Sequence, residues 1–187
     1  MSVIVIEFIT LDGIVSDPDG SAGTQLGGWA FGHGPQAVPG GKFRLGRTLD
    51  EGVLPLGRAT WQLFSRIWPG RDDPFPARMN AVPKLAASRT LTHADTSVWA
   101  NSQPPDGDLA DAVERERRDV DVTGGLSVVD RLRAADLADD YRLPTSPTVL
   151  GTGRRLFPAG GPRAELECLA AEQVGAAVLT RFRGAAR

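Results

Sequence analysis

Three short segments of the chain combine glycine with side chains that can hold a phosphate group. The first reads LGRATW over residues 56–61, so that Gly57 ends an apolar run and is followed by Arg58 and Thr60. If a helix begins at this point, its first amides and its dipole favour an anion, and the guanidinium adds a charged donor. The alternative is a strand end followed by a solvated arginine and a packing Trp61.

The second segment is a polar turn, Ser88-Arg89-Thr90, that follows a short apolar run. Two hydroxyls on either side of a guanidinium suit a phosphomonoester, because all three groups can donate hydrogen bonds to its oxygens. An ordinary surface turn is the alternative interpretation, since such polar triplets are common in loops.

The third segment, VTGGLS over residues 122–127, contains two adjacent glycines. Gly124 and Gly125 allow the backbone to approach a pyrophosphate or a flat ring closely, and a helix starting after them would supply amide donors. The pattern matches neither the dinucleotide fingerprint of ordinary Rossmann domains nor the P-loop. A tight turn without a ligand is the alternative.

Few other residues have spacings that indicate chemistry. Asp12, at the end of the first apolar run, is the one candidate for handling a proton; the alternative is a turn residue that caps its own backbone. His33 and His93 have no partner at metal or triad spacing, so surface positions are expected and no metal site is predicted. Cys168 alternates with leucines, which favours a packed thiol over a nucleophile.

The elements that must position these residues follow from the hydrophobic pattern. Apolar runs predict strands at 3–9, 53–57, 84–88, 96–99 and 119–123. Helical spacing predicts helices at 58–67, 106–118 and 126–135, the second capped by Asp106. Residues 69–83 hold four prolines and are expected to form a loop, with a short helical turn near Met79. Residues 16–41 are expected to form a long loop, more often a functional lid than a simple connection.

In the last part of the chain, apolar and polar residues alternate as in strands and no longer follow helical spacing. Residues 141–147 alternate, and two further alternating segments, 165–170 and 175–182, predict an antiparallel pair. In the part of the chain that precedes these segments, strands alternate with helices. This alternation indicates a mainly parallel sheet with right-handed crossovers. The predicted fold class is therefore α/β with antiparallel C-terminal strands. In such sheets ligands bind at the carboxyl ends of the strands, where the three phosphate-suited segments are expected.

Composition limits the classes of function. The 187 residues, of 19.9 kDa, suit one domain spanning 1–187, and 41% hydrophobic with 24% charged residues is ordinary globular usage. With 21 basic against 23 acidic residues there is no basic footprint for nucleic acid. No apolar run is long enough to span a bilayer, and the first residues lack the features of a signal peptide. A cytoplasmic protein is expected.

Five signatures occur in a fixed order along the chain. They are LDG at 11–13, LGRATW at 56–61, SRTL at 88–91, VTGGLSVV at 122–129 and VLGTGRRLF at 149–157. In this order they resemble the dihydrofolate reductase superfamily. The nearer likeness is to the reductase domain of riboflavin biosynthesis, the C-terminal half of the bifunctional deaminase–reductase. The resemblance extends from about residue 3 to residue 183.

This resemblance implies a dihydrofolate reductase-like three-layer α/β/α domain and NADPH as hydride donor. The positions that correspond to the family's cofactor-binding residues are Gly57, Arg58, Thr60, Ser88, Arg89, Thr90, Gly124, Gly125, Leu126 and Ser127. The resemblance to dihydrofolate reductases also implies a cis bond between the two adjacent glycines. Independently, both phosphate-facing junctions carry an arginine and no acidic residue, which favours NADPH over NADH.

The implied reaction is reduction of the imine form of a ribosylaminopyrimidine to a ribitylamine, as in the phosphoribosylaminouracil reductase of riboflavin biosynthesis. Dihydrofolate reductases place a carboxylate upstream of the glycine–arginine junction, but the position corresponding to it is Gly41, with no acid beside it. Folate reduction is therefore disfavoured. Another small imine or carbonyl reductase remains an alternative, as does a nucleotide-binding protein without turnover. The implied reaction predicts a small heterocyclic substrate. Relatives are commonly dimers, so a homodimer is also expected.

Overall fold

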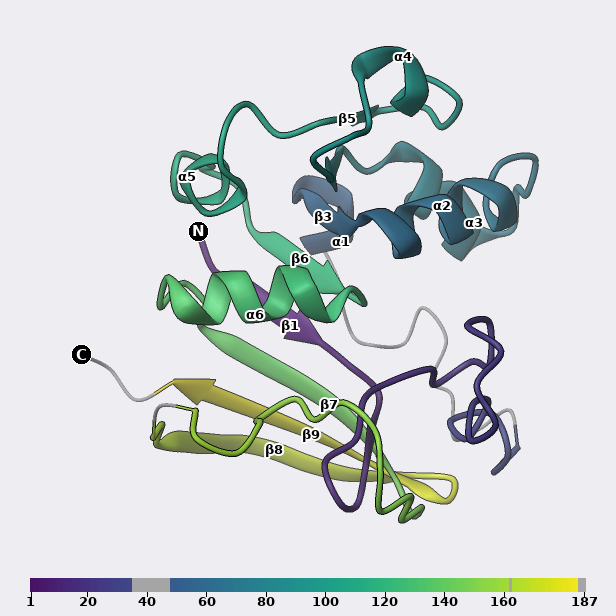
Figure 1. Cartoon of the computed structure of the whole chain (residues 1–187), viewed down its shortest axis with the longest axis vertical. Helices are drawn as coiled ribbons and strands as arrows, with labels where there is room; N and C mark the ends of the chain where they lie inside the picture. Colours follow the sequence, from purple (N-terminus) through teal and green to yellow (C-terminus); the bar gives the residue numbers. More distant parts are fainter. Residues whose placement is uncertain (35–47, 162, 185–187) are drawn as a thin grey trace. The chain divides into compact units, whose positions relative to one another are not determined.

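The structure, a computed structural model, describes residues 1–34, 48–161 and 163–184 (Figure 1). The chain forms two compact units. The first unit comprises Met1–Val5 and Arg44–Asp139, and the second comprises Ile6–Phe43 and Asp140–Arg187. The expectation of one domain over the whole length stays a prediction. Over the described ranges, no helix combines the length and the apolar character needed to cross a membrane.

The first unit contains four short strands, β3 (Leu54–Gly57), β4 (Lys84–Ala87), β5 (Ser102–Gln103) and β6 (Val120–Thr123). Three of them, β3, β4 and β6, are followed by the phosphate-suited segments. β3 pairs in parallel with β4, which pairs in parallel with β5. A parallel bridge between Val53 and Val120 brings β6 to the other side of β3. The carboxyl ends of β3, β4 and β6 therefore lie at the same edge.

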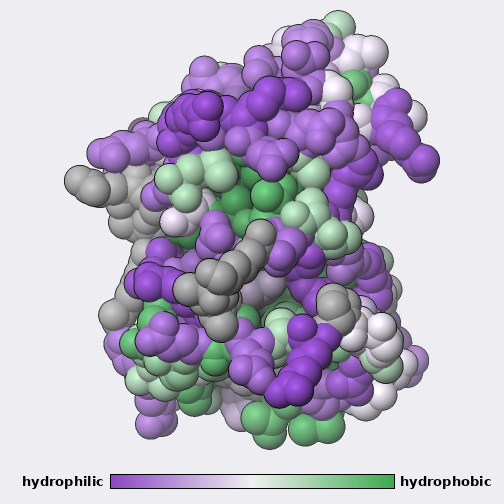
Figure 2. All heavy atoms as spheres, turned by 90° about the vertical axis from the view of Figure 1, so that its left-hand side faces the viewer, coloured by the Kyte–Doolittle hydropathy of each residue, from purple (hydrophilic) through white to green (hydrophobic). Residues whose placement is uncertain are grey.

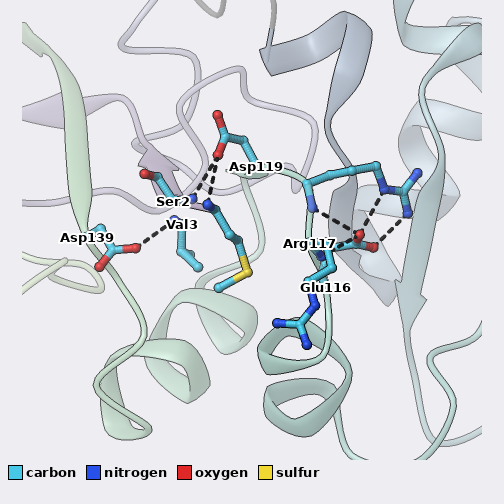
Figure 3. A network of polar contacts seen from close by, with 8 residues as sticks. Ser2, Val3, Glu116, Arg117, Asp119 and Asp139 are labelled. Carbon is cyan, nitrogen blue, oxygen red and sulfur yellow. Dashed lines mark hydrogen bonds and ion pairs between the residues drawn. The ribbon is translucent and has the colours of Figure 1, made fainter.

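The N-terminus of the chain is fixed to this unit by two carboxylates (Figure 3). Asp119 accepts a hydrogen bond from the amide of Ser2 at 2.8 Å, and Asp139 accepts one from the amide of Val3 at 2.8 Å. These bonds hold the start of β1 (Val3–Ile6), which lies next to β6. Figure 3 also shows Glu116 accepting hydrogen bonds from the chain that follows it.

Two helices begin directly after β3 and β6. They are α2 (Arg58–Ile67), which buries Trp61, and α6 (Leu126–Ala134), which buries Val128, Val129 and Leu132. Both pack against β3. Their sequence bounds agree with the helices predicted at 58–67 and 126–135, because the apolar spacing in both segments is helical and local. Short α1 (Thr48–Glu51) precedes β3.

The prediction of a loop over 69–83 is wrong in part. Helix α3 spans Pro74–Ala81, longer than the expected turn near Met79. Pro74 stands in the first turn, where a missing amide hydrogen costs nothing and a fixed φ favours the helix. Prolines here mark a helix start instead of a loop.

Two further local predictions are corrected. The strand expected at 96–99 is absent: α4 (His93–Thr96), started by a reciprocal capping box of Thr92 and Asp95, ends at residue 96, and residues 97–99 form turns. The helix expected at 106–118 is the shorter α5 (Leu109–Glu114), and Asp108 caps it in place of Asp106.

The second unit is built on an antiparallel sheet. β7 (Asp140–Ser146) and β8 (Leu166–Val174) flank β9 (Ala177–Gly184), and both pairings are antiparallel. The short β2 (Ile9–Thr10) pairs in parallel with β7. In Figure 1, β8 and β9 form the long hairpin at the yellow end of the chain. The predicted C-terminal antiparallel pair is confirmed, and so is the α/β class with parallel strands before it.

Strand β8 is largely exposed, which overturns one side-chain prediction. Cys168 was expected to be packed but is exposed, because β8 lies at the end of the strand order and neither of its faces is fully covered. Hydrophilic side chains cover most of the face drawn in Figure 2, and apolar ones gather there in separate patches.

Candidate functional site

The junction after β3 and the junction after β6 are in backbone contact. A Cβ atom built on Gly125 would lie 3.1 Å from the amide nitrogen of Gly57, and one on Gly57 would lie 3.5 Å from the Cα of Gly125. A Cβ on Gly124 would lie 3.2 Å from Cγ2 of Thr60. Glycine at these positions therefore allows two strand ends to approach each other. The structure brings together two of the three segments predicted to bind phosphate.

The glycine pair turns the chain without a cis bond. Gly124 and Gly125 have φ values of 71° and 90°, in the left-handed region that only glycine adopts without cost. No peptide bond in the described part of the chain is cis, so the cis bond expected between the two glycines is wrong. Two successive positive φ angles achieve the reversal with trans bonds.

A hydrogen bond joins the junction after β3 to the turn after β4. Nη1 of Arg58 donates to Oγ1 of Thr90 at 3.2 Å. The hydroxyl of Ser88 orders the turn by accepting from the amides of Thr90 and Leu91 at 3.1 and 3.2 Å. All three predicted segments therefore meet at the carboxyl ends of β3, β4 and β6.

The helix starts at this edge differ from the other helix starts in how they are capped. The N-caps of α2 and α6 are Gly57 and Gly125, and no side chain among the described residues caps either helix. By contrast, α4 and α5 are capped by Thr92 and Asp108, and α3 begins with proline, which lacks an amide hydrogen. First-turn amides left without a side-chain acceptor, with the positive end of the dipole, suit an anionic ligand.

The charges of the three segments also suit an anionic ligand. Arg58 and Arg89 are exposed, Thr60 is half-buried, and none of the segments 57–60, 88–90 and 124–127 contains a carboxylate. The donor set and the positive charge fit the phosphates of a dinucleotide, including an additional monoester at the exposed arginines. In the described ranges, no three His, Cys, Asp or Glu side chains gather as a metal site.

Asp12, the candidate for proton handling, belongs to the second unit and is occupied by structural hydrogen bonds. Its carboxylate accepts from Oγ1 of Thr10 at 2.6 Å and from the amides of Leu150 and Gly151 at 3.3 and 2.8 Å. The Thr10 hydroxyl, followed by these amides, lowers the pKa of Asp12 to about 2. A carboxylate that stays ionised near neutral pH is a poor proton donor. Its amide contacts tie the Asp12 turn to the distant Leu150–Gly151 segment, and a role in proton handling stays a prediction.

The same turn joins two of the five signature motifs. Ile14 forms an antiparallel bridge with Arg155, and the amide of Leu156 donates to the carbonyl of Gly13 at 3.2 Å. Nη1 of Arg155 donates to the carbonyl of Asp12. The LDG segment and the late VLGTGRRLF segment are thus paired backbone to backbone, which the sequence did not predict.

The long loop predicted over 16–41 is described as far as residue 34. Asp17 organises it by accepting hydrogen bonds from the amides of Ala22 and Thr24, both at 2.9 Å. Trp29 is buried and donates from Nε1 to the carbonyl of Ser16 at 3.0 Å. The remainder of the expected lid, Gly41 included, lies outside the described residues.

Lys84 is a functional-looking residue that sequence reasoning missed. It is only 1% exposed at the start of β4, and Nζ donates to the carbonyls of Asn80, Val82 and Ala100 at 3.0, 2.7 and 2.9 Å. The ammonium also lies 4.4 Å from the ring centre of Trp99. Lys84 therefore caps the end of α3 at the start of the strand that carries the Ser88 turn.

Comparisons with known proteins decide the family. The RibD C-terminal domain family matches residues 1–180, nearly the whole chain. The chain belongs to the RibD C-terminal domain family. Comparison with curated protein sequences gives no significant match.

Solved structures of similar fold agree with this assignment. A protein described as a riboflavin biosynthesis protein, from Shewanella sp. PV-4, has a TM-score of 0.73 at 21% identity, with 100% of both chains covered. A pyrimidine reductase-like protein from Corynebacterium diphtheriae has a TM-score of 0.60 at 12% identity, covering 100% of this chain and 92% of that one. RibD from Acinetobacter baumannii has a TM-score of 0.60 at 16% identity; 98% of this chain matches 57% of that longer chain. The dihydrofolate reductase-like fold class predicted from the sequence is confirmed.

Proposed function

We propose that this RibD C-terminal domain is an NADPH-dependent reductase of a ribosylaminopyrimidine, as in riboflavin biosynthesis. The observation that supports the proposal most is the meeting of three glycine- and arginine-bearing segments at one edge of the first unit. A similar fold occurs in a Thermotoga maritima protein whose name includes 5-amino-6-(5-phosphoribosylamino)uracil reductase, at 17% identity and a TM-score of 0.55.

Each segment has a distinct task in this proposal. The first-turn amides of α2, with Arg58 and Thr60, hold phosphate oxygens of the cofactor. The Ser88–Thr90 turn, with Arg89, holds the 2′-phosphate that distinguishes NADPH from NADH. Gly124 to Ser127 provide the close backbone approach for the pyrophosphate and the nicotinamide.

The bound cofactor supplies the hydride. The residues of the chain bind and orient: two helix N-termini and the arginines fix the phosphates, and the glycine contact between the strand ends fixes the distance between those termini. Such orientation lowers the barrier because the reacting groups no longer lose freedom in the reaction step. A homodimer stays a prediction.

Loss of reduced-nicotinamide absorbance on mixing the protein with NADPH and a phosphoribosylaminouracil tests the proposal. Substrate-dependent oxidation supports it, and a dihydropterin substrate in a parallel assay tests the folate alternative. Binding of NADPH, measured by fluorescence, without oxidation by any substrate would overturn the reductase proposal in favour of a nucleotide-binding protein. No binding of NADPH would overturn both.

A further inference from the structure

A hydrogen-bonded group of three side chains lies at the carboxyl ends of β3 and β4 in the first unit. Oγ1 of Thr90 lies 3.2 Å from Nη1 of Arg58 and 3.3 Å from Oγ of Ser88. Oγ of Ser88 accepts hydrogen bonds from the amides of Thr90 and Leu91 at 3.1 and 3.2 Å. Arg58 and Thr90 are exposed and Ser88 is half-buried, so a ligand can reach the first two directly.

The direction of each hydrogen bond in this group follows from a count of hydrogens and lone pairs. A hydroxyl group has one hydrogen to donate and two lone pairs with which to accept. Both lone pairs of Ser88 Oγ are taken by the two amides, so Ser88 is the donor in its bond to Thr90. A guanidinium can only donate, so Arg58 also donates to Thr90. Oγ1 of Thr90 therefore accepts two hydrogen bonds, and its own hydrogen takes part in neither.

The hydroxyl hydrogen of Thr90 is consequently available to a third partner, and that partner must be an acceptor. Arg58 and Arg89, which are exposed beside it in the same segments, likewise carry donors only. An ionised phosphate monoester has acceptors only and matches these donors. The hydrogen of a ribose hydroxyl would find no acceptor among these side chains, because the lone pairs of Thr90 are already occupied.

Neighbouring residues in the sequence do not supply the missing acceptor. Residues 85–87 of β4 are apolar, and the first carboxylate after the turn is Asp95 in α4. Asp95 accepts from the amide and the hydroxyl of Thr92 at 2.8 and 2.7 Å, and these bonds lower its pKa. Its carboxylate is therefore committed to the start of α4.

We propose that Thr90 is a specificity-determining residue and Ser88 a positioning residue for the cofactor, an inference that rests on the proposed function. The Thr90 hydroxyl donates to the 2′-phosphate of NADPH. Ser88 donates to Thr90 instead of to the phosphate, and so fixes the direction of that contact. Selection of NADPH over NADH then has two components: the charges of the arginines attract the phosphate, and the turn offers no acceptor for the 2′-hydroxyl of NADH.

Variants at Thr90 test the specificity contact. Thr90→Val removes the donor, and Thr90→Ser keeps it. Ser97→Ala is the control, because Ser97 is exposed and donates to the carbonyl of Ala94, outside the three segments. We expect Thr90→Val to weaken NADPH binding by roughly 10- to 150-fold, the range for a hydrogen bond to a charged group, and to leave NADH binding near wild type. Thr90→Ser and Ser97→Ala should bind both cofactors as the wild type does. Wild-type NADPH affinity in Thr90→Val would overturn the assignment.

Ser88→Ala separates a positioning role from simple support of the turn. Without the Ser88 hydroxyl, Oγ1 of Thr90 regains a lone pair that can accept from the 2′-hydroxyl of NADH. We therefore expect NADH to bind about 3- to 10-fold more tightly, the range for a neutral hydrogen bond, while NADPH binds more weakly. A residue that only supports the turn would weaken both cofactors when removed, so equal losses in Ser88→Ala would overturn the positioning role.

A last experiment examines the turn without the rest of the cofactor. Adenosine 2′-monophosphate and adenosine are titrated against the ¹⁵N-labelled wild type and Thr90→Val. We expect the monophosphate to shift the amides of residues 88–91 in the wild type and to bind more than about 10-fold more weakly to Thr90→Val, with no such shifts from adenosine. This result without oxidation of NADPH by any substrate would contradict the proposed function alone. Equal affinity of both proteins for the monophosphate, or no binding to the wild type, would overturn the role of Thr90 whatever the turnover.

Discussion

Arg58 donates a hydrogen bond from Nη1 to Oγ1 of Thr90, 32 residues later in the chain, at 3.2 Å. This bond joins the helix start after β3 to the turn after β4. It places one guanidinium beside the hydroxyls of that turn, where the adjacent Arg89 is also exposed. The relationship between Arg58 and Thr90 therefore underlies the proposed preference for a 2′-phosphate.

Substitution of these arginines should change cofactor choice. Arg58→Ala or Arg89→Ala removes a charge-assisted contact of about 1.5–3 kcal/mol, so NADPH should bind roughly 10- to 150-fold more weakly. In Arg89→Ala the affinity for NADH should remain near wild type. Arg66→Ala, at the other end of α2, is the control and should bind both cofactors normally. Equal losses of NADPH and NADH affinity in Arg89→Ala would show that its turn does not hold the 2′-phosphate.

The close approach of Gly125 to Gly57 should be measurable through the free energy of unfolding of glycine variants. Gly125 and Gly107 both have positive φ, at 90° and 81°, but a Cβ on Gly107 would meet nothing within 4 Å. Gly107→Ala should therefore cost only the backbone strain, about 1–2 kcal/mol. Gly125→Ala should cost about 1–3 kcal/mol more, because its Cβ would lie 3.1 Å from the amide of Gly57. Urea unfolding of both variants measures the difference, and equal costs would rule out a tight approach of the two strand ends.

The carboxylate of Asp12 should make stability depend on pH in the acid range. Its pKa is lowered from 3.8 to about 2, chiefly by the Thr10 hydroxyl, so its hydrogen bonds favour the folded state when the group is ionised. That contribution is complete above pH 3.8 and is lost as the pH falls towards 2. The difference in free energy of unfolding between wild type and Asp12→Asn should therefore shrink over this range in urea titrations. A difference that stays constant down to pH 2 would contradict these contacts.

Lys84 should affect stability in the alkaline range. Burial lowers the pKa of Lys84 from 10.5 to about 8, so between these values the unfolded chain binds more protons than the folded one. Wild-type stability should accordingly rise with pH through this window relative to Lys84→Met. At neutral pH, Lys84→Met leaves three carbonyls without their donor and should lower the free energy of unfolding by about 2–4 kcal/mol. Urea unfolding of both proteins across the pH range tests these two expectations. If the difference in free energy of unfolding between wild type and Lys84→Met does not change with pH, Lys84 is not desolvated.

Sequence alone could predict features that depend on neighbouring residues. The apolar spacing of Trp61 and of Val128 and Val129 is local, so α2 and α6 were predicted with nearly their observed bounds. The capping box of Thr92 and Asp95 is also a local signal that could have prevented the wrong strand at 96–99.

Features that depend on tertiary contacts could not be predicted in this way. Lys84 satisfies carbonyls on two separate segments, and lysine is almost never fully buried, so nothing in its neighbourhood indicated a buried site. His33 and Thr148 are 115 residues apart in the chain, and only the fold brings them together. The glycine pair was correctly placed beside the other two segments, but its positive φ angles could not be told from a cis bond by sequence.

Central to the proposal is that one dinucleotide contacts all three segments. Titration of the ¹⁵N-labelled protein with NADPH, followed by amide chemical shifts, tests this most directly. We expect the largest changes at residues 57–60, 88–90 and 124–127, and NADH should perturb residues 88–90 much less. Changes confined to other segments, or none at saturating NADPH, would contradict the assignment of this edge as the cofactor site.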